Sequence, residues 1–192
     1  MALLFTRDLP GTNFFRTVFF MPNLIGGLLL GFAWQFIFKQ VFNAIYTATG
    51  MEFFRNWLTD STTGFFALLI VMVWQMGGYM MIIYLNGLNA ISQDLYEAAK
   101  MDGAAGGQRF RYLTAPLLMP SFTIVLFLTL SGSFKLLDQN IALTDGDFNT
   151  RLLAMQILQT TNDTTPPNYG LAQAQAVVFF VIIAIISLTQ VY

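Results

Sequence analysis

Leu95-Tyr96-Glu97-Ala98-Ala99-Lys100-Met101-Asp102-Gly103-Ala104 is a charged stretch between two long apolar runs. The runs, residues 64–85 and 113–134, contain no Asp, Glu, Lys or Arg, and residues 17–38 and 170–192 form two more runs of this kind. Each run has 22 or 23 residues, and about 20 helical residues cross a hydrocarbon core about 30 Å thick. The sequence therefore predicts an all-α integral membrane protein with four transmembrane helices and both chain ends on one side.

The composition also indicates a membrane protein. Of 192 residues, 56% are apolar, 10% are charged and 20 are Phe, and the mean hydropathy is +0.61. A soluble domain of this size could not bury so much apolar surface. The net charge of −1 gives no basic field for nucleic acid, and without His or Cys the usual soft-metal ligands and the thiol nucleophile are missing. We expect membrane lipid around the chain, and no nucleic-acid partner, metal, cofactor or catalytic residue.

The distribution of Lys and Arg beside the apolar runs predicts the orientation. One side would carry Arg7, Arg16, Lys100, Arg109 and Arg111, and the other Lys39, Arg55, Lys135 and Arg151. The cations are densest in residues 100–111. We therefore predict that residues 1–16, the loop 86–112 and the C-terminus are cytoplasmic, and that the loops 39–63 and 135–169 are outside. Arg7 and Arg16 before the first run are not typical of a signal peptide, and the opening residues 1–5 look like the end of an earlier segment.

The charged stretch has a specific spacing. Glu97-Ala98-Ala99 is followed by three residues, Gly103, nine residues and Leu113-Thr114-Ala115-Pro116. This resembles the loop with which the membrane subunits of binding-protein-dependent ABC importers engage their ATPase, although Leu113 and Ala115 stand where Ile and Leu are usual. The resemblance implies an ATPase-docking loop that includes Leu95, Glu97, Ala98, Ala99, Asp102, Gly103, Ala104, Phe110 and Pro116.

Local chemistry is compatible with a short helix in this loop. Ser92 can cap the helix, and Asp94 lies early in it, where the helix dipole favours negative charge. Leu95, Ala98 and Ala99 are expected to line one face. Gly103 suits the left-handed residue that ends such a helix. The alternative is an ordinary solvated loop, in which Glu-Ala-Ala arises by chance.

Further segments are similar to the sugar and glycerol-phosphate branch of the same family. They are residues 14–22, 74–79, 85–91, 133–139 and 143–146. Ser92 replaces a usual Pro, residues 145–147 replace Gly-Gly-Pro, and Gly106-Gly107 would loosen a second loop helix. The resemblance implies the core of a type-1 ABC importer permease, the C-terminal part of a six-helix subunit in a prokaryotic cytoplasmic membrane. Its implied partners are a cytoplasmic ABC ATPase, a second permease chain, identical or related, and an extracytoplasmic solute-binding protein.

Polar residues inside the apolar runs are candidates for a solute pathway, because an unpaired amide in hydrocarbon is costly and tends to face a bundle interior or a wet cavity. The candidates are Asn23, Gln35, Gln75, Tyr79, Ser131 and Ser133, with Gln173 and Gln175 in the last run. Their amides and hydroxyls, with Trp34 and Trp74 nearby, would suit a sugar or related polyol. For each residue the alternative is a hydrogen bond that joins two helices.

Other functions fit less well. A self-sufficient channel or ion-coupled carrier commonly places ionisable groups at membrane depth, and the four runs contain none. A remaining alternative is an ABC permease that transports a solute other than a sugar. Asp138, Asp145, Asp147 and Asp163 do not have EF-hand spacing. No Gly-rich phosphate loop with its Lys is present, so ATP hydrolysis is expected in a separate subunit. Residues 160–168 are a turn-rich linker without assigned chemistry.

Overall fold

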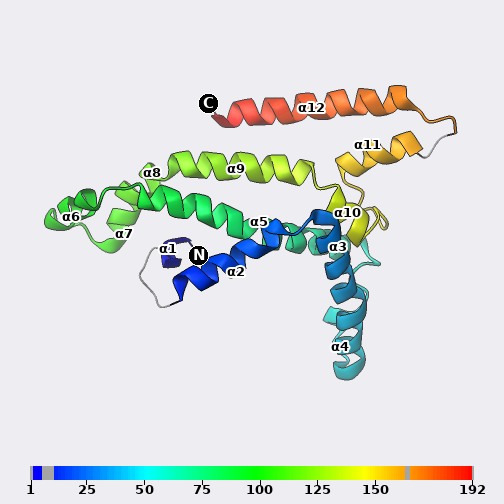
Figure 1. Cartoon of the computed structure of the whole chain (residues 1–192), viewed down its shortest axis with the longest axis horizontal. Coiled ribbons are helices and arrows are strands. Elements are labelled where there is room, and N and C mark those ends of the chain that lie inside the picture. The colour runs from blue at the N-terminus through cyan, green and yellow to red at the C-terminus, as the bar shows by residue number, and fades with distance from the viewer. Residues whose placement is uncertain (1, 6–10, 163–164, 192) are drawn as a thin grey trace. The chain divides into compact units, whose positions relative to one another are not determined.

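The computed structural model describes residues 2–5, 11–162 and 165–191, and these residues form helices and turns without a strand (Figure 1). The helices are α1 (Ala2–Phe5), α2 (Thr12–Leu24), α3 (Gly27–Phe36), α4 (Phe42–Thr49), α5 (Ser61–Asn89), α6 (Gln93–Met101), α7 (Gly106–Arg109), α8 (Ala115–Leu117), α9 (Met119–Phe134), α10 (Asp138–Leu143), α11 (Leu153–Asn162) and α12 (Tyr169–Val191). Ile37–Val41 and Phe110–Thr114 are π-helical turns, and Glu52–Phe54 is a 3-10 turn. The all-α prediction is confirmed. Predictions about Met1, Arg7, Asp163 and Tyr192 lie outside the described residues.

The chain forms two compact units. The first contains Met1–Asn23 and Met76–Thr129, and the second contains Leu24–Gln75 and Leu130–Tyr192. Within the described residues, three helical stretches are long and apolar enough to cross a membrane: Gly27–Thr49, Ser61–Asn89 and Tyr169–Gln190. The stretches Gly106–Leu117 and Met119–Phe134 meet at a bend of 63° and count as a fourth if they form one broken span.

The first apolar run differs from its expected form. Residues 17–38 were expected to be one helix, but α2 ends at Leu24, Gly26 is extended with φ −58° and ψ 140°, and α3 begins at Gly27. Pro22 removes one helical hydrogen-bond donor, and two successive glycines each cost the helix about 1 kcal/mol relative to Ala. The carbonyl that the break exposes at Ile25 accepts a hydrogen bond from the side chain of Gln75 at 3.0 Å.

The predicted outer loop 39–63 is helical over its first part. The helical stretch that starts at Gly27 continues through Lys39 to Thr49 and ends at Gly50, whose φ is +69°. A single Lys does not end a membrane helix, because its long stem can carry the charge to the interface. The chain then turns back, and the Trp57 ring stacks on Phe38 at 5.3 Å with 6° between the planes.

Helices pack closely at glycines within each unit. In the first unit, a Cβ on Gly78 of α5 would overlap the backbone of Phe19 in α2, and one on Gly87 would overlap Ser121 of α9. In the second unit, a Cβ on Gly31 of α3 would lie 2.6 Å from the Cβ of Ala142 in α10. Small residues at helix contacts are the usual means of close approach in membrane proteins.

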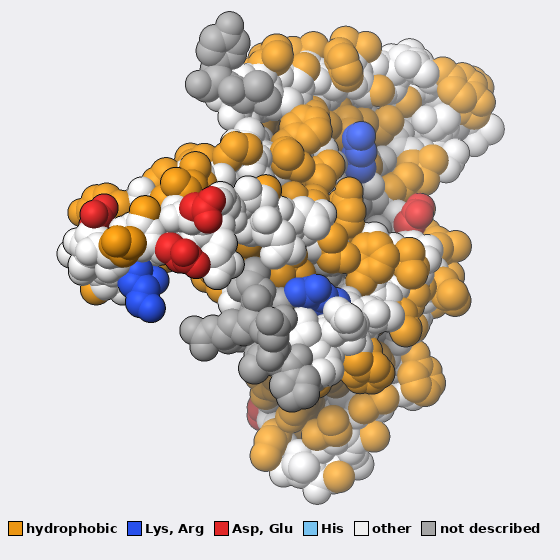
Figure 2. All heavy atoms as spheres, turned by 60° about the vertical axis from the view of Figure 1, so that its left-hand side comes forward, with side chains coloured by type: hydrophobic (Ala, Val, Ile, Leu, Met, Phe, Trp, Pro, Cys, Tyr) orange, Lys and Arg blue, Asp and Glu red, His pale blue; other side chains and the backbone are white. Residues whose placement is uncertain are grey.

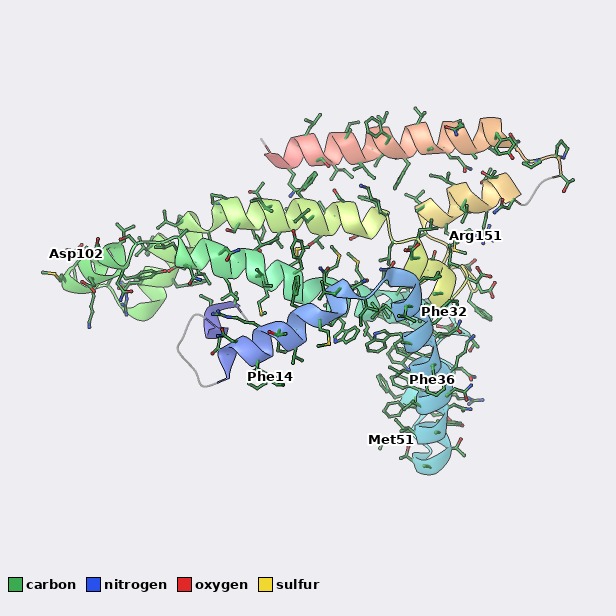
Figure 3. The ribbon with its side chains drawn as sticks, viewed as in Figure 1. Phe14, Phe32, Phe36, Met51, Asp102 and Arg151 are labelled. Carbon is green, nitrogen blue, oxygen red and sulfur yellow. The ribbon has the colours of Figure 1, made fainter. Side chains whose placement is uncertain are left out.

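Large apolar side chains remain uncovered. Figure 2 shows apolar side chains over most of the visible face, with acidic and basic side chains gathered at a few places. Phe32 and Phe36 stand out from α3 (Figure 3), and on α12 Val177, Phe180 and Leu188 are each more than 60% exposed. Exposed apolar area of this extent marks contact with lipid or with a partner protein.

Candidate functional site

The predicted docking loop is an ordered helical hairpin in the first unit, here called the α6 hairpin (residues 92–117). The Ser92 hydroxyl accepts a hydrogen bond from the Asp94 backbone amide at 3.3 Å, and Asp94 lies in the first turn of α6. The predicted cap is confirmed. The hydroxyl satisfies one of the amides that the start of a helix leaves unpaired.

The C-terminal end of α6 is a Schellman motif. The Gly103 amide donates to the Lys100 carbonyl at 3.1 Å, and the Ala104 amide donates to the Ala99 carbonyl at 3.0 Å. Gly103 has a φ of +77°, and a Cβ added to it would meet nothing within 4 Å. The prediction that Gly103 adopts a left-handed conformation is confirmed. Glycine is favoured at this position by its backbone conformation and not by close packing.

The second half of the hairpin holds α6 in place. The Gln108 Oε1 caps α7 by accepting from the Ala105 amide at 2.8 Å. Thr114 is buried, and its hydroxyl forms a hydrogen bond with the Tyr96 hydroxyl at 3.0 Å. This contact connects α6 directly to the chain that enters α8 and α9. Pro116 lies in the helical stretch Gly106–Leu117, two residues after the π-helical turn Phe110–Thr114.

One face of α6 is open to a partner. Asp94, Glu97, Ala98 and Met101 are exposed, and their i, i+3, i+4, i+7 spacing places them on a single stripe. Met101 is 89% exposed, and Asp102 follows at the end of the helix (Figure 3). Leu95 and Phe110 are each nearly half exposed. α6 places Leu95, Ala98 and Ala99 at i, i+3 and i+4 on one face, as expected, with Leu95 and Ala98 exposed and Ala99 half-buried.

Two of the candidate pathway residues make contacts inside the second unit. The Gln75 Nε2 donates to the Ile25 carbonyl at 3.0 Å, and its Oε1 accepts from the Gln139 Nε2 at 2.6 Å. The Gln35 Nε2 donates to the Leu143 carbonyl at 3.2 Å. These amides connect α3 and α5 to α10 and to the break at Ile25, which favours the alternative in which they join helices.

The other candidates lie in both units. Asn23 and Tyr79 belong to the first unit, where the Tyr79 ring is tilted against Phe20 at 6.5 Å. Ser131 and Ser133 belong to the second unit and are half-buried on α9. The aromatic rings expected near a sugar, Trp34 and Trp74, pack edge-to-face on each other at 5.5 Å.

Asn140 is a buried polar centre that sequence reasoning missed. Its side chain is fully buried, donates to the Thr144 hydroxyl at 2.9 Å and to the Thr150 carbonyl at 3.0 Å, and accepts from the Leu152 amide at 3.0 Å. It therefore organises the predicted outer loop after α10. The Asn140–Thr144 spacing of four residues was the only local signal, whereas the contacts to Thr150 and Leu152 depend on the turn between them.

The acidic residues that the structure describes lie apart from one another. Among the residues described, no three of Asp138, Asp145, Asp147 and the other acidic side chains gather as a candidate metal site. An ion pair joins Arg55 to Glu52 at 3.2 Å on the surface. The hydrogen bond to Glu52 raises the pKa of Arg55.

Comparisons with known proteins agree with this geometry. Residues 1–192 match the family model described as "Binding-protein-dependent transport system inner membrane component". The whole chain aligns with 66% of the length of AmyD from Thermoanaerobacterium thermosulfurigenes, a probable starch degradation products transport permease, at 48% sequence identity. It also aligns with 64% of the length of MalF from Thermococcus litoralis, a trehalose/maltose transport permease, at 31% sequence identity. The chain thus spans about two thirds of the length of these relatives.

A solved structure shows the same fold. It is the crystal structure of a bacterial ABC transporter involved in import of the acidic polysaccharide alginate. The match has a TM-score of 0.78 at 21% identity and covers 98% of this chain and 68% of the other.

Proposed function

Because the chain belongs to the family of binding-protein-dependent transport system inner membrane components, we propose that it is a permease subunit of an ATP-driven importer for a sugar or related polyol. It is a multi-pass protein of the cytoplasmic membrane. In this proposal its helices contribute to the solute pathway, and ATP is hydrolysed by a separate cytoplasmic ATPase subunit. The observation that carries the proposal is the ordered α6 hairpin with its exposed stripe.

The α6 hairpin is suited to transmit force from an ATPase. Glu97 offers a carboxylate, Ala98 leaves room for close approach, and Met101 offers an adaptable apolar contact. Both ends of α6 are capped, so the helix can move as a rigid body. The Tyr96–Thr114 hydrogen bond then passes the movement to the segment before α9. Closure of the ATPase would in this way alter the arrangement of the membrane helices.

The proposed orientation can be tested with single cysteines, because the native chain has none. Gly107 and Asn162 are exposed and lie on opposite sides in the proposal. We expect a membrane-impermeant maleimide to label Gly107→Cys only in inside-out vesicles and Asn162→Cys only in intact cells. Labelling of Gly107→Cys in intact cells would reverse the orientation and remove the docking role.

The proposed solute class has two supports. The relatives named above include permeases for starch degradation products and for trehalose/maltose, and the polar residues of the apolar runs are neutral amides and hydroxyls, which suit a polyhydroxylated solute. The pathway is proposed to include Asn23, Tyr79, Ser131 and Ser133. Gln35 and Gln75 would border it while joining helices.

The variant Gln75→Leu distinguishes a role of Gln75 in solute transport from a role in holding helices together by hydrogen bonds. It leaves the Ile25 carbonyl and the Gln139 amide without their partner, and each unsatisfied buried group costs about 1–3 kcal/mol. We expect less assembled subunit, with an unchanged uptake rate per assembled complex. The exposed Gln40→Leu, which lies outside the candidate pathway residues, is the matched control. A lower uptake rate per complex, different for different sugars, would place Gln75 on the pathway instead.

The partners follow from the same proposal. A solute-binding protein would deliver the solute to the loops on the outer side, and a second permease chain would complete the pathway that one chain cannot enclose. The alternative, an ion-coupled carrier, lacks the ionisable residues within the apolar runs that such proteins use. Uptake that persists after the ATPase is inactivated, and that collapses with the ion gradient, would favour this alternative.

A further inference from the structure

A groove with one polar and one apolar end lies between α2 and α5 in the first unit. The two helices contact each other at Phe19 and Gly78, and the Phe20 and Tyr79 rings lie beside that contact. From there a cavity of about 290 Å³ opens along both helices. Its wall is apolar at Phe20, Ile82 and Leu85 and polar at Arg16, Asn86 and Asn89.

A second cavity continues at the polar end. It has a volume of about 570 Å³, shares Asn89 with the groove, and is lined by side chains of the α6 hairpin that include Gln93, Tyr96 and Arg109. The Nε of Arg109 is buried and has no hydrogen-bond partner among the described residues. The side chain of Arg109 therefore holds an unused donor at the wall of this cavity.

Among the described residues, the charges that line the two cavities have one sign. These charged side chains are Arg16 and Arg109, and no described Asp or Glu lines either cavity. A site of this kind favours an anion, and guanidinium groups are well matched to phosphate oxygens. An inorganic anion alone would leave Phe20, Ile82 and Leu85 uncovered, so an anion that carries an apolar chain would fill more of the groove.

The position along the sequence matches the edge of a membrane. Arg16 comes immediately before the uncharged run 17–38, and Asn86 comes immediately after the run 64–85. The polar end of the groove therefore lies where the apolar segments end, at the level of lipid headgroups, and its apolar wall extends into the segments themselves. Basic pockets between membrane helices at this level bind anionic lipid headgroups.

We propose that the groove between α2 and α5, with the adjoining cavity under the α6 hairpin, binds one anionic phospholipid. Arg16 and Arg109 bind its phosphate and headgroup, Asn86 and Asn89 donate amide hydrogen bonds, and an acyl chain lies along Phe20, Ile82 and Leu85. The site belongs to the first unit alone and does not depend on which solute is transported. A lipid there would join α2 and α5 to the base of the α6 hairpin.

The test measures lipid binding by native mass spectrometry of the purified transporter complex. Phosphatidylglycerol and phosphatidylcholine with identical acyl chains are added in turn. We expect phosphatidylglycerol to remain bound roughly tenfold more than phosphatidylcholine, and the double variant R16Q/R109Q to lose that preference, because each lost charge-assisted hydrogen bond is worth roughly a tenfold change in affinity. R16K/R109K, which keeps both charges, should retain most of it.

Matched controls make the result decisive. R55Q/R151Q removes two exposed cations from outside both cavities and should leave the lipid preference unchanged. An excess of inorganic phosphate should not displace the lipid. Equal binding of the two lipids by the wild-type complex would overturn the proposal even if R16Q/R109Q failed to assemble. A full preference in R16Q/R109Q, an equal loss in R55Q/R151Q, or displacement of the lipid by phosphate would also overturn it.

Discussion

Gly103→Val is expected to uncouple ATP hydrolysis from solute uptake in the complete transporter, with roughly tenfold less uptake per assembled complex. Gly103 ends α6 with a φ of +77°, a conformation that costs a residue with a Cβ about 1–2 kcal/mol and is least accessible to a β-branched side chain. A cost of about 1.4 kcal/mol corresponds to a factor of ten in an equilibrium constant. The Schellman hydrogen bonds would open, and the exposed stripe of α6 would lose its fixed position.

Two further variants separate backbone conformation from side-chain size. Asn tolerates the left-handed conformation better than other residues, so Gly103→Asn should retain most of the coupled uptake. Gly107→Ala adds a Cβ that meets nothing within 4 Å at a position without a left-handed backbone, and should behave like the wild type. Uptake and ATPase activity are measured on the same reconstituted vesicles. Wild-type coupling in Gly103→Val would exclude a role of this helix end in docking.

Gly78→Ala is expected to destabilise the subunit by about 3 kcal/mol, at the upper end of the usual cost of overpacking. The added Cβ would overlap the backbone of Phe19 in α2. A backbone carbonyl cannot rotate away as a side chain can, so α2 must move off α5 along its length. The loss should appear as a lower temperature at which the purified subunit leaves the monodisperse peak in size-exclusion chromatography.

The adjacent glycine provides the control. A Cβ on Gly77 would meet nothing within 4 Å, and Ala favours a helix by about 1 kcal/mol over Gly. Gly77→Ala should therefore be as stable as the wild type or slightly more stable. Equal losses in the two variants would show that glycine flexibility in α5, and not the contact with Phe19, is what the helix needs.

Local sequence features were enough to predict α5, α12 and the ends of α6. Long uncharged runs identify membrane helices because charge in hydrocarbon is costly. Ser92 and Gly103 identify the helix ends because capping and left-handed conformations depend on a few neighbouring residues. The two helix ends depend on hydrogen bonds between residues at most about five apart along the chain.

Features that rest on distant contacts were not predicted. The hydrogen bond that satisfies the Ile25 carbonyl at the break comes from Gln75, 50 residues later in the chain. Pro22, Gly26 and Gly27 were local signals of the break, but the uncharged run around them looked like one helix. The buried role of Asn140 depends on the return of the chain at Thr150 and Leu152. The extension of the helix past Lys39 to Thr49 depends on how a single cation is accommodated, which the charge alone did not reveal.

Site-specific photocrosslinking from Met101 tests the proposed docking of α6 most directly. Met101 is 89% exposed on the stripe that also carries Glu97 and Ala98, so a photoreactive residue there should leave the fold intact. In membranes that contain the assembled transporter, we predict a covalent adduct between Met101→p-benzoylphenylalanine and the ATPase subunit, and no such adduct from the same substitution at Asn162. An assembled complex in which position 101 forms no ATPase adduct, or in which position 162 does, would contradict the docking role of the α6 hairpin.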